Sequence, residues 1–165
     1  MIMRGFSLLE TIVAISILTL ALLGPLALAA FALRSASLSE NEVIAFNLAE
    51  EGMEFVINKR DSNIFAGAGN WLQGLTNCQS ANGCFVDVTN NSVRTCSANC
   101  PFLKRNTSSG LYNYVSGPDT IFRRKVALES VSSNSDERKV KVSVSWAERF
   151  GNRSFTLEHN IFKKR

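Results

Sequence analysis

Four cysteines are the residues of this sequence whose type and spacing most directly predict chemistry. They lie within 23 residues, as C-x5-C and C-x3-C with eleven residues between the pairs: Cys78, Cys84, Cys96 and Cys100. Clustered thiols in a loop-rich segment, behind an N-terminus typical of exported proteins, predict two disulfides. A zinc site is the alternative, although C-x5-C fits the usual ligand spacing loosely. Two pairings stay open: Cys78–Cys84 with Cys96–Cys100, or Cys84–Cys96 nested inside Cys78–Cys100.

Residues that commonly carry catalysis are sparse. The single histidine, His159, lies in a predicted strand without an evident partner. The chain has no glycine-rich phosphate loop, no metal-ligand spacing and no paired-carboxylate motif. Glu50, Glu51 and Glu54 are most simply the solvated face of a helix. We therefore expect a protein that is not an enzyme and that uses no cofactor or metal.

Glu10 is a carboxylate placed one helical turn inside an apolar pattern that begins at Phe6. The 23 residues from 11 to 33 that follow carry no charge. As a helix they would reach about 35 Å, against a hydrocarbon core of about 30 Å, so they are long enough to cross a membrane. A carboxylate near the middle of a bilayer costs about 2–3 kcal/mol. Its presence in such a segment therefore needs a physical reason.

Three interpretations of this N-terminus stay open. A secretory signal peptide would use "MIMR" as its charged region and "ALA" at 27–29 for cleavage, but the apolar run exceeds the usual length of about 7–15 residues. An uncleaved membrane anchor is the second interpretation. Neither gives Glu10 a purpose. In the third, cleavage between Gly5 and Phe6 keeps the apolar helix and creates a cationic amine four residues from Glu10.

The helical pattern continues beyond residue 33 and becomes amphipathic. Apolar residues fall on one side of the helix: Leu38, Ala45, Leu48, Ala49, Gly52, Met53 and Val56. Glutamates fall on the other side: Glu40, Glu50, Glu51 and Glu54. No strong stop signal precedes "NKRDSN" at 58–63. We expect one long helix with a kink or loosened turn at Gly24 and Pro25, because proline removes a backbone donor and crowds the preceding turn.

The C-terminal third predicts an antiparallel sheet. Residues 139–146 alternate strictly, with valines and a tryptophan on one face and lysines and serines on the other. Residues 120–131 and 153–162 have the same character, which predicts a three-stranded meander over about 121–162, with 84–88 or 111–114 as a possible fourth strand. The apolar stripe of the helix would cover one face of this sheet. The predicted fold is α+β: a long N-terminal helix packed on a small antiparallel sheet.

Charge divides the chain into an acidic first part and a basic second part. Residues 1–61 hold four basic and seven acidic groups, and residues 62–165 hold fourteen and seven. Six basic residues form a candidate anion- or DNA-binding set: Arg123, Arg124, Lys125, Arg138, Lys139 and Lys141. The alternative is a solvated sheet face. In the "RRK" triplet side chains alternate faces, so at least one of them points toward the core or lies at a strand end.

The segment "RGFSLLET" at 4–11 resembles the prepilin motif of type IV pilins and type II secretion pseudopilins. In that motif a short basic leader ends in glycine, and phenylalanine, apolar residues and a glutamate five residues after the cut follow. Arg4, Gly5, Phe6 and Glu10 occupy the matching positions. The later run "AFNLAEEGMEFVINKRDSN" is similar to minor pilins, which favours a minor over a major subunit.

The resemblance implies a pilin fold and an order of events. A prepilin peptidase would remove leader 1–5 after Gly5 and methylate the Phe6 amine. Residues 6–33 would hold the chain in the cytoplasmic or inner membrane, with the amphipathic half 34–61 and the globular head 62–165 outside. An assembly platform would then pack these helices into a pilus or pseudopilus, where Glu10 pairs with the Phe6 amine of a neighbouring subunit. The partners would be the peptidase, the platform, the membrane and other pilins. The alternative function is an adhesive or DNA-binding module mounted on the membrane or pilus.

Overall fold

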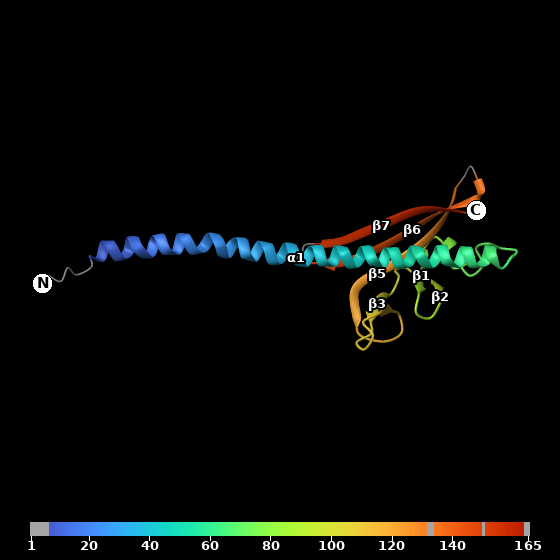
Figure 1. Cartoon of the computed structure of the whole chain (residues 1–165), viewed down its shortest axis with the longest axis horizontal. Coiled ribbons are helices and arrows are strands. Elements are labelled where there is room, and N and C mark those ends of the chain that lie inside the picture. The colour runs from blue at the N-terminus through green and yellow to red at the C-terminus, as the bar shows by residue number, and fades with distance from the viewer. Residues whose placement is uncertain (1–6, 132–133, 150, 164–165) are drawn as a thin grey trace. The chain divides into compact units, whose positions relative to one another are not determined.

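The computed structural model describes residues 7–131, 134–149 and 151–163 and divides into two units, residues 1–41 and 42–165 (Figure 1). A single 58-residue helix, α1 (Leu8–Phe65), runs through both units. It ends a few residues beyond the predicted stop near residue 61. Arg4, Gly5 and Phe6 lie outside the described residues.

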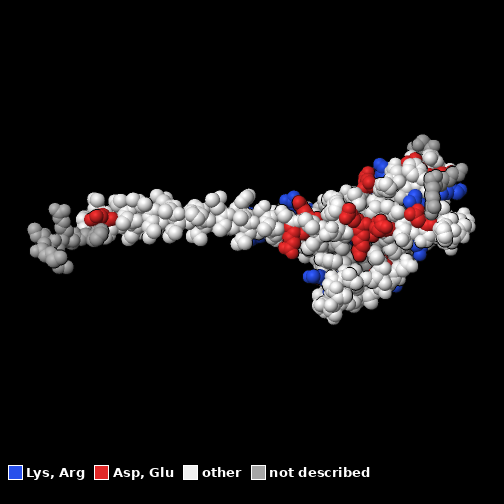
Figure 2. Space-filling view, in the orientation of Figure 1, with Lys and Arg blue, Asp and Glu red and all other residues white. Residues whose placement is uncertain are grey.

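The first unit is the apolar half of α1. Every described residue from Ser7 to Ser37 is exposed, and Figure 2 shows no charged side chains over the uncharged run of residues 11–33. The most apolar 18-residue window has a mean hydropathy of 2.5 and is 0 % buried, so this helix is long and apolar enough to cross a membrane. The helix continues through Pro25, as predicted. The kink at Gly24 and Pro25 stays a prediction.

Three hydroxyl side chains in the apolar half donate hydrogen bonds to backbone carbonyls of the same helix. Thr11 Oγ1 donates to the Leu8 carbonyl at 2.8 Å, and Ser16 Oγ donates to the Ile12 carbonyl at 2.8 Å. Thr19 Oγ1 donates to the Ser16 carbonyl at 2.9 Å. A polar group in an apolar medium costs free energy unless it is hydrogen-bonded, so these bonds make the three residues compatible with lipid or a packed helix bundle.

In the second unit the amphipathic half of α1 covers an antiparallel sheet. Its buried residues recur every three or four positions, as a helix with one apolar face requires: Ala45, Leu48, Ala49, Gly52, Met53 and Val56. Across from them, one face of the sheet supplies Val140, Val142, Val144 and Trp146, all buried. The strand alternation and the helix stripe from Ala45 to Val56 are therefore confirmed, whereas Leu38, the first predicted member of the stripe, is only half-buried.

Within the described residues the sheet has seven strands and follows a short 3₁₀ helix, η1 (Thr76–Gln79). The strands are β1 (Cys84–Asp87), β2 (Ser92–Thr95), β3 (Phe102–Arg105), β4 (Tyr112–Asn113), β5 (Asp119–Val131), β6 (Asn134–Glu148) and β7 (Gly151–Phe162). Strands β5, β6 and β7 form the predicted meander. Two short ribbons, β1–β2 and β3–β4, pair with β5 through β1 and β3. The expected three or four strands were too few, because these ribbons add four.

At Gly52 the backbone of α1 lies close to the sheet. A Cβ at this position would lie 3.0 Å from Val142 Cγ1 and 3.1 Å from Arg124 Cδ. Both distances are shorter than ordinary van der Waals contact. The absence of a side chain at Gly52 therefore lets the helix backbone settle onto β5 and β6 and brings the carbonyls of this turn within reach of β5 side chains.

Candidate functional site

The first turn of α1 combines one charge with a fully exposed apolar surface. The Ser7 carbonyl accepts hydrogen bonds from the backbone N–H groups of Glu10, at 3.0 Å, and Thr11, at 3.2 Å. Glu10 is exposed, and its apolar neighbours are exposed by 48–77 %: Leu8, Leu9, Ile12 and Val13. An apolar helix surface of this kind is stable in lipid or against other helices, and water is unfavourable to it.

The predicted processing site adjoins this turn. Gly5 and the Phe6 amine lie outside the described residues. Cleavage after Gly5, methylation of Phe6 and the pairing of its amine with Glu10 therefore stay predictions. The exposed position of Glu10, in the first helical turn, is compatible with a partner supplied by another chain.

All four cysteines form disulfides, and they pair locally. Cys78 bonds to Cys84, and Cys96 bonds to Cys100. The first bond ties η1 to the start of β1, and Cys84 is also the residue through which β1 pairs with Val126 of β5. All four side chains are buried. The disulfides therefore hold the β1–β2 ribbon and its flanking loops onto the core.

Arg124 is a buried cation that joins the helix to the sheet. Its side chain is only 1 % exposed. Nη1 donates to the Leu48 carbonyl at 2.9 Å and to Glu51 Oε2, and Nη2 donates to the Val86 carbonyl at 2.8 Å. A buried charge is tolerated only when it is paired and hydrogen-bonded, and these three acceptors satisfy Nη1 and Nη2. Among the described residues the buried Nε has no hydrogen-bond partner. Arg124 thus links α1, β1 and β5 and cannot reach a ligand in solution.

Asp87 anchors the turn that follows β1. Its carboxylate accepts hydrogen bonds from the Thr89 hydroxyl at 2.6 Å, the Asn90 amide at 2.9 Å and the Tyr114 backbone N–H at 3.3 Å. Burial alone would raise the pKa of Asp87, but these hydrogen bonds outweigh it, and the pKa lies below its usual value. Burial raises the pKa of Tyr114 to about 12, although the Arg124 guanidinium opposes that shift.

The other basic residues of the candidate anion-binding set do not form one patch with Arg124. Lys141 lies between Glu129 at 3.0 Å and Glu158 at 3.6 Å, and Lys139 lies 3.5 Å from Glu158. The hydrogen bond with Glu129, followed by the charge of both glutamates, holds the pKa of Lys141 above its usual value. These lysines belong to a ladder of alternating charge across β5, β6 and β7, which weakens their attraction for an anion.

The remaining members of that set are dispersed. Arg123 stacks on the Phe102 ring, 3.8 Å from its centroid, and donates to the Cys100 carbonyl at 2.9 Å. Arg138 donates to the Ser135 and Glu137 carbonyls, and Lys125 is exposed on the face of β5 opposite Arg124. The sequence alternation in "RRK" indicated that one residue turns to the core, and that residue is Arg124. The pairing of Arg124 with Glu51 had no signal in the sequence, because 73 residues separate them.

Comparison with protein-family models, with curated proteins and with solved structures finds no match to this chain. The fold and the placement of the residues described above are therefore what bears on function.

Proposed function

We propose that the chain is a minor pilin or pseudopilin, a structural subunit that a membrane holds before assembly and that packs into a filament through its N-terminal helix. The observation that carries the proposal is the apolar half of α1: it is exposed throughout, with a mean hydropathy of 2.5 in its most apolar window. A surface of this kind requires lipid or other helices around it.

Two further features support the filament over a plain membrane anchor. Glu10 interrupts the apolar surface in the first turn of the helix, where an anchor alone has no use for a charge. The α+β arrangement, with the amphipathic half of α1 on an antiparallel sheet, is the arrangement that the resemblance to pilins implies.

The proposed order of events begins with cleavage after Gly5 by a prepilin peptidase and methylation of Phe6. Each subunit then waits in the membrane until it docks on a growing bundle of helices. Lipid and leucine are similarly apolar, so apolar contact gives docking little selectivity. Pairing Glu10 with the methylated amine of a neighbouring subunit would supply that selectivity, because two charges that lipid leaves unpaired then meet.

The intact mass and N-terminal sequence of the chain, co-expressed with a prepilin peptidase and kept unreduced, test the proposal. We expect a chain that begins at methylated Phe6. A chain beginning at Ala30 would instead indicate a secreted domain, and an uncut chain would indicate a simple anchor. Either result would contradict the proposed processing. A Gly5→Leu variant provides the control, since it should block the cut and leave residues 7–163 unchanged.

A further inference from the structure

Strand β7 is a long and regular edge of the sheet. Among the described residues it pairs with β6 alone, through twelve consecutive partners from Glu137↔Phe162 to Glu148↔Gly151 with no shift of register. The strand contains no proline and no bulge, which are two common devices that protect an edge. The strands that end the other side of the sheet, β2 and β4, have only four and two residues.

The hydrogen-bond pattern shows which backbone groups of β7 are free to bind. The Lys163 N–H donates to the Asp136 carbonyl at 2.8 Å, so these two residues form a hydrogen-bonded pair in the same register as the rest of the ladder. Such pairs alternate along antiparallel strands. Odd-numbered residues of β7 therefore bond to β6, and even-numbered residues point their N–H and C=O groups away from it: Asn152, Ser154, Thr156, Glu158, Asn160 and Phe162.

Two other contacts agree with this assignment. The Phe162 carbonyl, which should point outward, accepts a hydrogen bond from Arg60 Nη1 at 3.3 Å. The hydroxyls of Ser143 and Thr156 lie 2.9 Å apart, as expected for a directly opposed pair that is not hydrogen-bonded through its backbone, where side chains come closest. The outward groups from Asn152 to Asn160 can therefore pair with a further strand.

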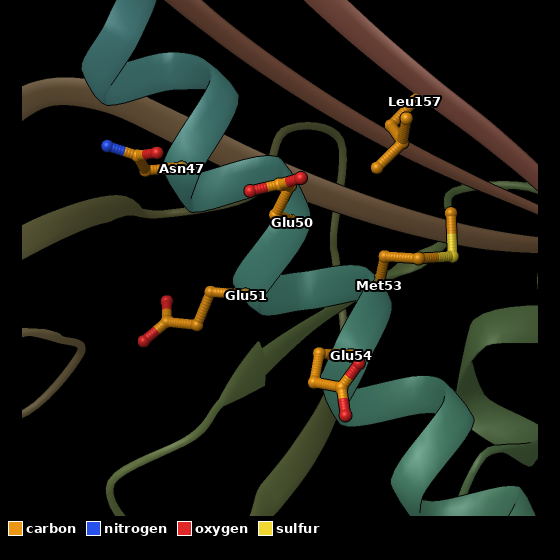
Figure 3. A pocket seen from close by; sticks show the side chains of 6 residues that line it. All are labelled: Asn47, Glu50, Glu51, Met53, Glu54 and Leu157. Atoms are coloured by element: carbon orange, nitrogen blue, oxygen red, sulfur yellow. The ribbon is translucent and has the colours of Figure 1, made fainter.

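A groove lies between this edge and the helix. Its volume is about 490 Å³, and Leu157 of β7 lines it together with Asn47, Glu50, Glu51, Met53 and Glu54 of α1. Figure 3 shows Leu157 across from the helix, and the side chain of Glu51 extends away from Leu157. Glu51 is the residue that pairs with Arg124. Glu50 and Glu54 are exposed and take no part in the ion pair of Arg124 with Glu51. The lining of the groove therefore combines apolar side chains, Met53 and Leu157, with the carboxylates of Glu50 and Glu54. Acidic side chains gather on this face of the second unit (Figure 2).

We propose that the β7 edge and this groove together bind an extended segment of another protein that carries lysine or arginine on one face. The segment would add a strand to the sheet, as peptides do at exposed sheet edges. Side chains on the same face as Leu157 would then enter the groove. Lysine and arginine fit it best, because their aliphatic stems cover Met53 and Leu157 while their charged ends reach Glu50 and Glu54. The inference does not depend on processing of the N-terminus or on a filament.

Binding of the peptide acetyl-TKTVTKT-amide to the full chain in detergent micelles tests this inference. Lysine, valine and lysine lie on one face of this peptide and threonine on the other. We expect saturable binding, together with slower hydrogen exchange of the amides of Asn152, Ser154, Thr156, Glu158 and Asn160. The same peptide with glutamate in place of lysine is the charge control and should not bind. Absence of binding by the lysine peptide would overturn the proposal.

Matched variants separate the backbone contribution from the charge contribution. Thr156→Pro removes an outward N–H and leaves the bonds to β6, whereas Thr156→Ala loses the same hydroxyl and keeps the N–H. We expect Thr156→Pro to raise the Kd at least about tenfold and Thr156→Ala not to do so. Glu50→Gln with Glu54→Gln should weaken binding, and Glu40→Gln with Glu42→Gln, outside the groove, should not.

Three results would contradict the inference. Peptide binding that is unchanged in Thr156→Pro would indicate attraction by charge without strand addition. Binding that is unchanged in the Glu50 and Glu54 variant would place the peptide elsewhere. Protection of the same β7 amides by raising the protein concentration, without peptide, would assign the edge to a second copy of this chain. Circular dichroism of each variant verifies that the fold persists.

Discussion

A single buried guanidinium connects three elements of the second unit, so its removal should affect stability more than any exposed charge. Arg124→Ala would leave the carbonyls of Leu48 and Val86 without their donor and would open space beneath α1. We expect a loss on the order of 3 kcal/mol in the free energy of unfolding, measured by urea denaturation of the full chain in detergent. Lys125→Ala, the next residue of β5 and exposed, is the control and should change stability by less than about 0.5 kcal/mol. Equal effects would contradict the assigned contacts of Arg124.

Asp87 should make the free energy of unfolding depend on pH. Its pKa in the folded chain lies below the usual value of 3.8, so the fold favours the carboxylate form. The resulting stabilisation is complete above about pH 4 and is lost as the pH falls through the folded pKa. Asp87→Asn should therefore cost about 1–2 kcal/mol at neutral pH and less at pH 3. Urea denaturation across this range measures the difference, and Asp119→Asn, at an exposed carboxylate, is the control. A cost that does not change with pH would contradict the assignment.

The local disulfide pairing predicts a simple peptide map at the scale of the elements. Between Arg60 and Lys104 the only site for trypsin is Arg94, which lies between the two cysteine pairs. Digestion without reduction should give one peptide containing Cys78–Cys84 and a second, separate peptide containing Cys96–Cys100. Mass spectrometry distinguishes this from the nested pairing, in which the two peptides would stay joined until reduction. A joined product would contradict the observed connectivity.

The elements that the sequence predicts well are those with a long periodic pattern. The helix stripe from Ala45 to Val56 and the alternation of residues 139–146 each repeat often enough to fix both the element and its buried face. Strands β2 and β3 have four residues each and place charged residues next to apolar ones, so their periodicity is too short to detect. They form by pairing with other strands, β2 with its neighbour β1 and β3 with β5. The 73 residues between Glu51 and Arg124 explain why the sequence predicts only a solvated helix face for Glu51, although it also pairs with Arg124.

At the scale of the whole molecule, the two halves of α1 depend on different environments. The core of the second unit begins at Ala45 and ends at Ile161, and it includes the Cys78–Cys84 disulfide. The apolar run from 11 to 33 adds no buried residue to this core. The sequence predicts that the helix changes from apolar on all sides to amphipathic near residue 33, whereas the compact second unit begins at Glu42. The residues between these points are helical and exposed or half-buried, so no pattern of burial marks the boundary more sharply.

This division predicts that residues 42–165 fold without the apolar half of the helix. A chain that begins at Glu42 should be soluble without detergent, form both disulfides and unfold cooperatively, because every contact of its core is present. Its midpoint in urea should match that of the full chain in detergent, apart from fraying of the new helix end, which affects about one turn.

The full chain should instead partition into lipid vesicles. Replacing Leu18, Leu22 and Leu26 by serine should reduce that partitioning, while the urea midpoint of the second unit stays the same. A fragment that fails to fold, or a full chain that stays in water, would show that the two halves of α1 are not independent.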